Sequence, residues 1–375
     1  MSERGTLLIT GGRLLDPKNG VDQEIDLLIE NGVVVDRVAP GQGPKSALRL
    51  EAKDRWVLPG FVDLRARLRD QHDVRAALSG GYTTVVASPE SELKSTAELN
   101  LLHAAPLTKG LSGEELGEVN DHAACLSNGS RPVVRAGLMR RALQYARPLK
   151  TVVMVHAEDP TLSGKGVLGE GLVASHLGLP AVPASAEVSM VARDLSLFEE
   201  IGGRLHFSHL TCEGSMRLVR DAKARGLAVT CDVTPIHLSR SDEVAKGYSL
   251  AARVWPPLRP AHHVHALLDA VKDDTIDAIA TDHVRVDPTE REHPFDMCAP
   301  GEAQLSTAWR AAMQLKLAPM QLAKLFSHGP ASVLGLDIGH LSNGARGDVT
   351  IVNPKTLEVH YTLVGGSVRH SRGEA

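Results

Sequence analysis

The chain has 375 residues, of which 43% are hydrophobic and 23% charged, which suffices for one large domain with a small additional module or for two medium domains. A formal net charge of -4 gives no general attraction to nucleic acid or anionic membranes, and an aromatic content of 3% argues against base stacking on single strands. No apolar run has membrane-spanning length, and residues 1–5 lack the pattern of a secretory signal.

Four widely separated cysteines form no CxxC pair, which is typical of reduced, buried thiols: Cys125, Cys212, Cys231 and Cys298. Reduced cysteines and the absence of a signal pattern predict a cytoplasmic protein. The charge and composition predict that it binds neither nucleic acid nor membrane.

Short strands are expected near both termini. Residues 7–10, 26–29 and 33–35 are apolar runs separated by glycine-rich turns, and residues 349–352 and 359–364 are similar. We therefore expect a small β-sandwich module built from residues 1–56 and 342–375.

The intervening sequence alternates between short apolar runs and amphipathic helical stretches. The runs lie at residues 56–58, 83–86, 152–155, 205–207, 227–230 and 276–280, and the helical stretches at 137–146, 186–201 and 215–224. Strand and helix in alternation indicate parallel strands with helical crossovers. Because no glycine-rich dinucleotide fingerprint is present, we expect a (β/α)8 TIM-type barrel over residues 57–341, with residues 56–58 as its first strand.

In such a barrel the chemistry lies at the carboxyl ends of the strands. The sequence PGFVDLRARLR, which runs from Pro59 to Arg69, resembles the PGFVDxHxHLR motif of metal-dependent amidohydrolases, and of dihydroorotases in particular. The likeness extends over nearly the whole chain in the family's order, through residues 105–116, 139–146, 155–159, 206–210, 233–238, 256–259 and 280–283.

The two histidines of that motif hold a catalytic zinc in the active family. Here their positions are Arg65 and Arg67, and arginine cannot be deprotonated to become a ligand. A unit positive charge about 4 Å from a divalent cation costs roughly 8 kcal/mol at an effective dielectric constant near 20. The two arginines therefore argue against a metal.

A third metal position is also lost. Asn128 lies in SNGS, where the resemblance implies an SDDG that supplies a metal-bridging carboxylate. His156, His209 and Asp282 remain as the residue types that the family uses for metal. Three protein ligands can suffice for a catalytic zinc, so these survivors leave a reduced metal site open.

The substrate pocket implied by the resemblance departs from the family in several places. Arg69 stands where the family's arginine grips the substrate carboxylate, but Glu90 replaces the amide of MPNT and Trp255 the asparagine of NPPLR. Val286 replaces the last histidine of DHAPH, and Gln304 begins QLST in place of GLET. Catalytic groups act as a unit, so these losses together predict an inactive site.

Asp282 is the general base of the active family, a role that needs metal-bound water. We expect instead a buried carboxylate that pairs with Arg65 or Arg67. His156 and His209 could hold a single metal with His237 or Cys231, although ordinary hydrogen bonding is the more common state of such histidines.

The remaining candidates predict little chemistry. Cys231 and Cys298 lack a neighbouring base and are expected to be structural thiols. His262, His263 and His265 open an expected helix and are expected to face solvent.

Three functions remain open. The first is a non-catalytic dihydroorotase homologue without a cofactor, which the resemblance implies to be a partner of aspartate carbamoyltransferase in a hetero-oligomer. The second is an active cyclic amidohydrolase with one zinc on His156, His209 and Asp282. The third is a sensor that binds an anionic metabolite through Arg69.

Overall fold

A curled parallel sheet forms the larger part of the molecule in the computed structural model, which describes residues 5–118 and 123–373; residues 1–4, where no signal sequence is expected, lie outside this range. The sheet order runs from β17 to β18 through seven other strands, and β17 and β18 are separated by only three residues of one segment. The sheet therefore closes into an eight-stranded barrel whose strands are β8 (Phe61–Arg67), β9 (Tyr82–Ala87), β10 (Asn100–Pro106), β11 (Cys125–Ser127), β12 (Val153–His156), β15 (Leu205–Ser208), β16 (Val229–Val233), and β17 (Ala278–Ile279) with β18 (His283–Val284).

Barrel strands are buried on both faces, as the runs of apolar residues predict. All residues of β9 and β12 are buried, and β8 is buried except for Arg67 at its carboxyl end. Polar side chains therefore emerge where the strands end, which places the candidate residues at one mouth of the barrel.

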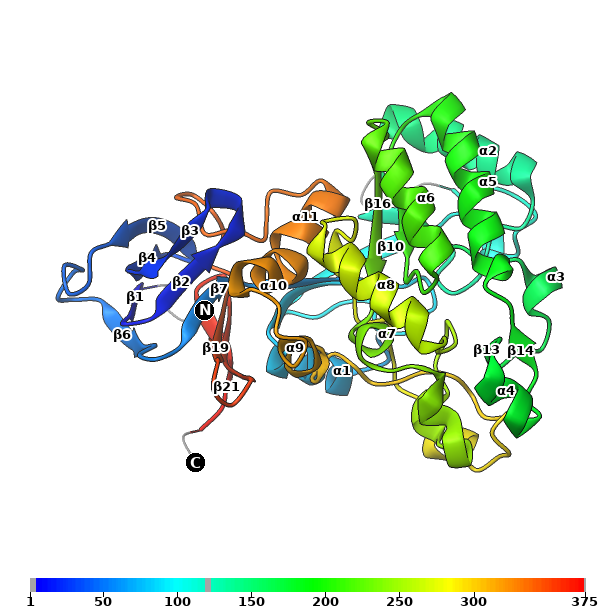
Figure 1. Cartoon of the computed structure of the whole chain (residues 1–375). Helices are drawn as coiled ribbons and strands as arrows, with labels where there is room; N and C mark the ends of the chain where they lie inside the picture. The colour runs from blue at the N-terminus through cyan, green and yellow to red at the C-terminus, as the bar shows by residue number, and fades with distance from the viewer. Residues whose placement is uncertain (1–4, 119–122, 374–375) are drawn as a thin grey trace.

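The outer helices are packed around the barrel (Figure 1). The three expected helical stretches are confirmed as α2, α5 and α6. The α-helices of the described residues are α1 (Gln71–Ser79), α2 (Ala136–Leu149), α3 (Pro160–Ser163), α4 (Leu172–Leu177), α5 (Ser185–Ile201), α6 (Glu213–Ala224), α7 (Pro235–Ser239), α8 (Ala261–Lys272), α9 (Ala308–Met313), α10 (Pro319–Phe326) and α11 (His328–Leu334). Between α3 and α5, β13 (Leu168–Gly169) pairs with β14 (Ala181–Val182).

The alternation of strand and helix is not complete. Residues 88–99, all of which the structure describes, contain no helix between β9 and β10. Between β10 and β11 the described residues contain only the short 3-10 turn η2 (Lys109–Leu111). The described residues of these two connections are therefore mostly loops, and one of them, Glu90, lines the barrel mouth.

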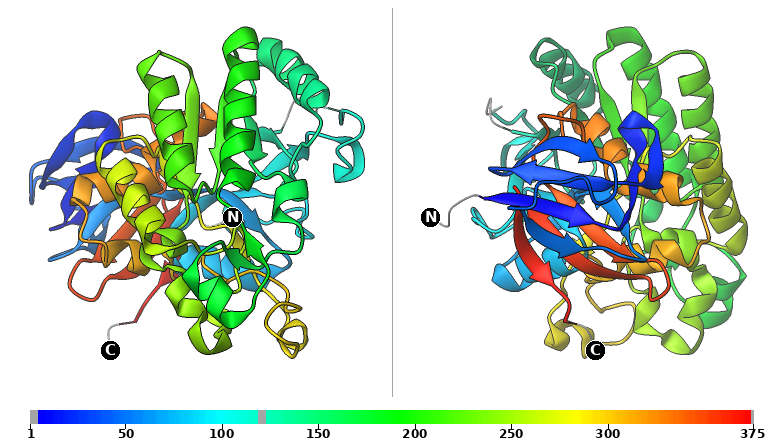
Figure 2. Two further views of the ribbon diagram at one scale, coloured as in Figure 1. Left: turned by 45° about the vertical axis from the view of Figure 1, so that its right-hand side comes forward. Right: turned by 90° about the vertical axis from the view of Figure 1, so that its left-hand side faces the viewer.

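The second part of the molecule is a β-sandwich (Figure 2). One sheet comprises β5 (Val33–Val38), β4 (Asp26–Glu30), β1 (Thr6–Thr10) and β6 (Leu48–Glu51). The other comprises β21 (Ser367–Ser371), β20 (Glu358–Val364), β19 (Val349–Asn353), β7 (Trp56–Pro59), β2 (Arg13–Asp16) and β3 (Val21–Glu24). Apolar residues of both sheets, such as Ile9, Leu14 and Ile351, share one buried cluster.

Residues 56–58 were expected to start the barrel, and this prediction is wrong. They form β7, which pairs antiparallel with β19 and parallel with β2 in the sandwich. The barrel starts two residues after β7 ends, at Phe61. An apolar run fits the interior of either sheet, so hydrophobicity alone could not assign it.

An aromatic cluster closes the amino-terminal end of the barrel, opposite the mouth. The ring centroids of Phe61, at the start of β8, and Trp309 of α9 are 4.8 Å apart, and Phe326 of α10 lies 5.2 Å from Phe61. Burial of these large rings stabilises the barrel independently of the residues at its mouth. None of the helices in the described part of the chain has the length and apolar character to span a bilayer.

Candidate functional site

A cavity of about 720 Å³ opens at the carboxyl ends of the barrel strands, where the candidate residues were expected. Its lining combines five arginines and three carboxylates with apolar walls: Arg65, Arg67, Arg69, Arg131, Arg285, Glu90, Asp282, Glu290, Leu111, Trp255, Val284, Val286 and Pro300, among others.

Arg65 forms the expected ion pair with Asp282. Its Nη2 lies 3.5 Å from Asp282 Oδ1, and both side chains are nearly buried, with 10% and 11% exposed. Burial alone would raise the pKa of Asp282, but the charges of Arg65 and His209 outweigh it and hold the pKa far below its usual range. The Asp282 carboxylate is therefore ionised, and cationic side chains of the protein balance its charge.

Arg65 also acts on Glu90. Burial would raise the pKa of Glu90, yet the Arg65 charge and hydrogen bonds from Ser130 lower it. The Ser130 backbone N–H and Oγ–H donate to Glu90 Oε1 at 3.0 and 2.9 Å. The acid that replaces the family's amide therefore anchors a loop.

Arg67 behaves differently from Arg65. It is the one exposed residue of β8 and lines the cavity, but among the described residues it has no ion pair. Of the two arginines proposed as partners of Asp282, the structure pairs only Arg65.

His209 is held by a carboxylate that the sequence reasoning did not single out. Asp232, at the end of β16, accepts from the His209 backbone N–H and from Nδ1–H, both at 2.7 Å, and Nε2 of His206 lies 2.8 Å from its other oxygen. His209 Nε2 points toward Asp282 Oδ1 at 3.5 Å. Burial would lower the pKa of His209, but Asp232 and Asp282 raise it to about 9, so the ring is an imidazolium at neutral pH.

The backbone at these strand ends is constrained. His209 and Asp282 have positive φ angles of 58° and 46°. Asp63, the aspartate of PGFVD, accepts hydrogen bonds from Thr281 N at 2.7 Å and Thr281 Oγ1 at 2.5 Å. This contact fixes the chain immediately before Asp282 and offsets the strain there.

His156 is committed to other partners. Its Nε2 lies 2.8 Å from Glu158 Oε2, and the indole N–H of Trp255 donates to the same carboxylate oxygen at 3.0 Å. The residue that replaces the family's asparagine thus closes over His156. Glu158 was visible in the sequence only as a member of the HxED segment.

The described residues do not fit a metal centre at the mouth. Ligand atoms of His156, His209 and Asp282 do not all lie within 4.8 Å of one another, as the ligands of one metal ion would. In the described ranges, one other group of side chains does lie this close together. Asn128 turns away, since its amide oxygen accepts from Thr108 N at 2.9 Å and its nitrogen donates to Thr108 Oγ1 at 2.7 Å. Two cations, Arg65 and the His209 imidazolium, flank Asp282 instead.

His237 and Cys231, considered as additional ligands, are engaged elsewhere. Nδ1 of His237 faces Thr234 Oγ1 at 2.8 Å and Nε2 faces the Pro256 carbonyl at 2.9 Å, while burial lowers the pKa of the ring to about 4. The Cys231 thiol contacts the Thr275 carbonyl at 3.4 Å, and burial raises its pKa.

Arg69 lines the cavity but is partly occupied. Its Nη1 donates to the Arg285 carbonyl at 3.0 Å, and Nε lies 3.7 Å from the exposed Glu92. Arg285 itself is matched by Asp70 at 2.5 Å and Asp73 at 3.1 Å, which do not line the cavity.

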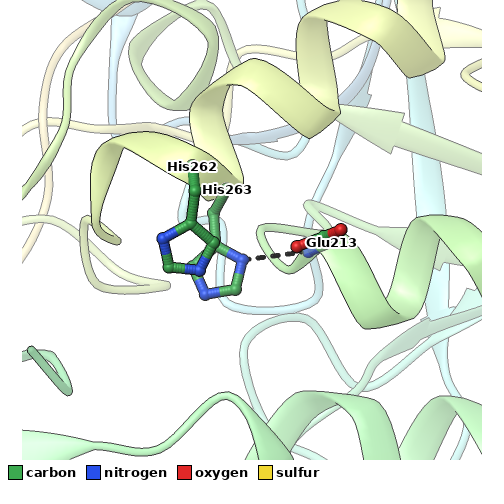
Figure 3. A group of neighbouring side chains, drawn as sticks. All are labelled: Glu213, His262 and His263. Carbon is green, nitrogen blue, oxygen red and sulfur yellow. Dashed lines mark hydrogen bonds between the residues drawn. The ribbon is translucent and has the colours of Figure 1, made fainter.

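The group that does meet the distance criterion is Glu213, His262 and His263, at the amino ends of α6 and α8 (Figure 3). The Glu213 backbone N–H donates to His263 Nδ1 at 3.1 Å, which places the ring proton on Nε2 and leaves no lone pair there for a metal. His263 thus satisfies a free N–H at the start of α6. With 9% exposure it contradicts the expectation that this histidine faces solvent, whereas His262 and His265 are exposed.

Comparison with known proteins gives consistent similarities. A family described as Dihydro-orotase-like matches residues 54–215. A Dihydroorotase from Anaeromyxobacter dehalogenans (strain 2CP-1 / ATCC BAA-258) is 40% identical over 427 positions, covering 98% of this chain and 99% of that protein. A Dihydroorotase from Citrifermentans bemidjiense is 39% identical over 93% of this chain and 90% of the relative.

Solved structures agree on the fold. An L-hydantoinase from Arthrobacter aurescens superimposes with a TM-score of 0.82 at 19% identity over 98% of this chain and 96% of its own. A D-hydantoinase gives a TM-score of 0.80 at 20% identity, over 97% of this chain and 95% of its own. These similarities support the barrel with an attached β-sandwich.

Proposed function

We propose that this chain, which belongs to the dihydroorotase-like family, is a non-catalytic member of it. It serves in the cytoplasm as a structural partner of aspartate carbamoyltransferase in pyrimidine biosynthesis, without a metal cofactor. The observation that carries the proposal is the placement of Arg65 and His209 around Asp282, each with a side-chain nitrogen 3.5 Å from its Oδ1.

Catalysis by the active family needs a carboxylate base next to an activated water. Here Asp282 is a weak base because two cations hold its pKa low against the effect of burial. His156 is tied to Glu158 and covered by Trp255. A barrel can lose these functions and keep its stability, because its aromatic cluster lies at the opposite end.

A scaffold role is compatible with the retained fold but rests on the family resemblance for its partner. The test is size-exclusion chromatography with light scattering on the purified chain mixed with aspartate carbamoyltransferase from the same organism. The expected result is one joint peak whose mass exceeds either component. Separate elution at all mixing ratios would refute the partnership.

The second candidate is an active, zinc-dependent cyclic amidohydrolase. It is favoured by the name Dihydroorotase of the relatives and by His209 Nε2, which is buried without a hydrogen bond in the described structure. Zinc content after dialysis against zinc, measured together with interconversion of carbamoyl-aspartate and dihydroorotate, separates the two candidates.

The expected result is neither zinc retention nor turnover in the wild type. The double substitution Arg65→His/Arg67→His is expected to stay inactive, because Asn128, Glu90 and Trp255 still depart from the family pattern. About one zinc per chain with measurable turnover in the wild type would establish the second candidate and overturn the first.

A further inference from the structure

The charges lining the mouth cavity do not balance. Five arginines face three carboxylates. Arg65 is matched by Asp282 and Glu90, and Arg285 by Asp70 and Asp73 beyond the cavity. Arg69 is engaged by Glu92 and by the Arg285 carbonyl. The Glu290 carboxylate accepts a hydrogen bond from the Asp287 backbone N–H, as part of a capping box at the start of a short 3-10 helix.

Two guanidinium groups remain. Within residues 5–118 and 123–373, neither Arg67 nor Arg131 has an ion pair or a side-chain hydrogen bond, although both line the cavity. A concave wall with apolar patches concentrates their positive field at the mouth. Each guanidinium offers parallel N–H donors that match the oxygens of a carboxylate or phosphate.

The backbone that carries Arg131 is fixed on both sides. Asn128 is held by Thr108 at one end of the turn, and the Ser130 N–H and hydroxyl are held by Glu90 at the other. Gly129 between them has φ +61°, and a Cβ there would collide with the Glu90 carboxylate. Arg131 therefore extends from a turn ordered before any ligand arrives, which lowers the entropic cost of binding.

Arg67 lines the same cavity from a different segment of the chain. It is the last residue of β8, and its position in the sheet is set by pairing with Val284 of β18. The geometry points to a binding site for a phosphate group, free or carried by a small metabolite, held between Arg67 and Arg131. Two bidentate forks supply four donors, which matches the several oxygens and the charge of about -1.5 to -2 that a phosphate concentrates on one centre.

This site is separate from the scaffold role, since within the described ranges neither of its arginines forms an ion pair with Asp282. It also differs from the carboxylate position that the family resemblance gives to Arg69. The probe for the test is inorganic phosphate, added to the purified full-length chain in a phosphate-free buffer, with succinate and chloride at matched ionic strength as comparisons.

Isothermal titration calorimetry is expected to show saturable phosphate binding that chloride does not reproduce. Arg67→Gln and Arg131→Gln should each raise the dissociation constant for phosphate at least about tenfold, which corresponds to the free energy of one charge-assisted hydrogen bond. Both side chains are exposed, so these variants should unfold at the wild-type temperature when phosphate is absent. Arg141→Gln, at another exposed arginine on α2, is the matched control and should bind as the wild type does.

Three results would overturn the assignment. One is phosphate binding no stronger than that of chloride. Another is wild-type affinity in both variants, which would place the bound phosphate elsewhere. The third is tighter binding of succinate than of phosphate, which would make the ligand a dicarboxylate. Loss of the carbamoyltransferase complex would leave these measurements unaffected, so the two proposals fail independently.

Discussion

Replacement of Arg65 by methionine tests the central feature of the mouth. For two unit charges 3.5 Å apart, Coulomb's law with an effective dielectric constant of about 20 gives about 5 kcal/mol. Part of this is offset in the wild type by desolvation of the guanidinium, and Asp282 keeps His209 as a second cation. We therefore expect Arg65→Met to lower the free energy of unfolding by about 3 kcal/mol at pH 7.

The effect has a defined pH dependence. A carboxylate whose pKa is depressed in the folded state stabilises the protein above its unfolded pKa, about 4, and loses that contribution as the pH falls toward the folded value. Without Arg65 the pKa of Asp282 rises, so less of this contribution exists to be lost. The difference between wild type and variant should thus be full at pH 7 and shrink below pH about 4.

Urea unfolding followed by circular dichroism at several pH values measures this difference. Arg67→Met is the matched control, because it lies two residues along the same strand but has no ion pair among the described residues, and its effect should stay within about 0.5 kcal/mol. Equal stability of the two variants at pH 7 would refute the reasoning that Arg65 provides the counter-charge of Asp282.

Three further predictions concern other parts of the molecule. Folding raises the pKa of His209 to about 9, so the stabilisation by its protonated ring is full below about pH 6.5 and is lost as the pH rises through 9. The free energy of unfolding of the wild type should therefore fall by about 3 kcal/mol over that window. In urea unfolding at several pH values, His209→Asn should flatten this dependence of stability on pH, and an unchanged slope would mean that the ring is neutral. Gly129→Ala should cost at least about 1–2 kcal/mol for the left-handed backbone, with additional displacement of Glu90; a thermal melt equal to that of the wild type would contradict this. Trp309→Ala, in the aromatic cluster, should cost about 3–5 kcal/mol in chemical denaturation, and a loss below 1 kcal/mol would show that the cluster is not a packed core.

The sequence predicted which residues would meet at the mouth better than it predicted their states. Alternating runs and the strand-end rule placed Arg65, His209 and Asp282 together, because parallel strands deliver their carboxyl ends to one face. The high pKa of His209 could not be foreseen, since it depends on Asp232, whose side chain arrives from the neighbouring strand 23 residues later.

Residues that look equivalent in the sequence can also differ in how deeply they are buried. Arg65 and Arg67 share one side of a strand by their spacing, but Arg65 is nearly buried and Arg67 is exposed because β8 ends there. Strands β10 and β11 gave no apolar run, since β10 is partly exposed and β11 has only three residues. The hydrophobic pattern of a sequence reflects burial, so it does not identify a strand that is short or half exposed.

The register between β7 and β19 sets an order of events during synthesis. Pro59 faces Val349 and Trp56 faces Val352, so strands made early obtain their sheet neighbour only after nearly the whole barrel has left the ribosome. Until then β7 lacks one partner and presents an open edge that can join another chain. Among the barrel strands, β8 also waits for a late neighbour, β18, whereas the strands from β9 to β16 pair with strands that precede or follow them closely along the sequence. Nascent chains stalled before residue 349 are therefore the species most in need of a chaperone.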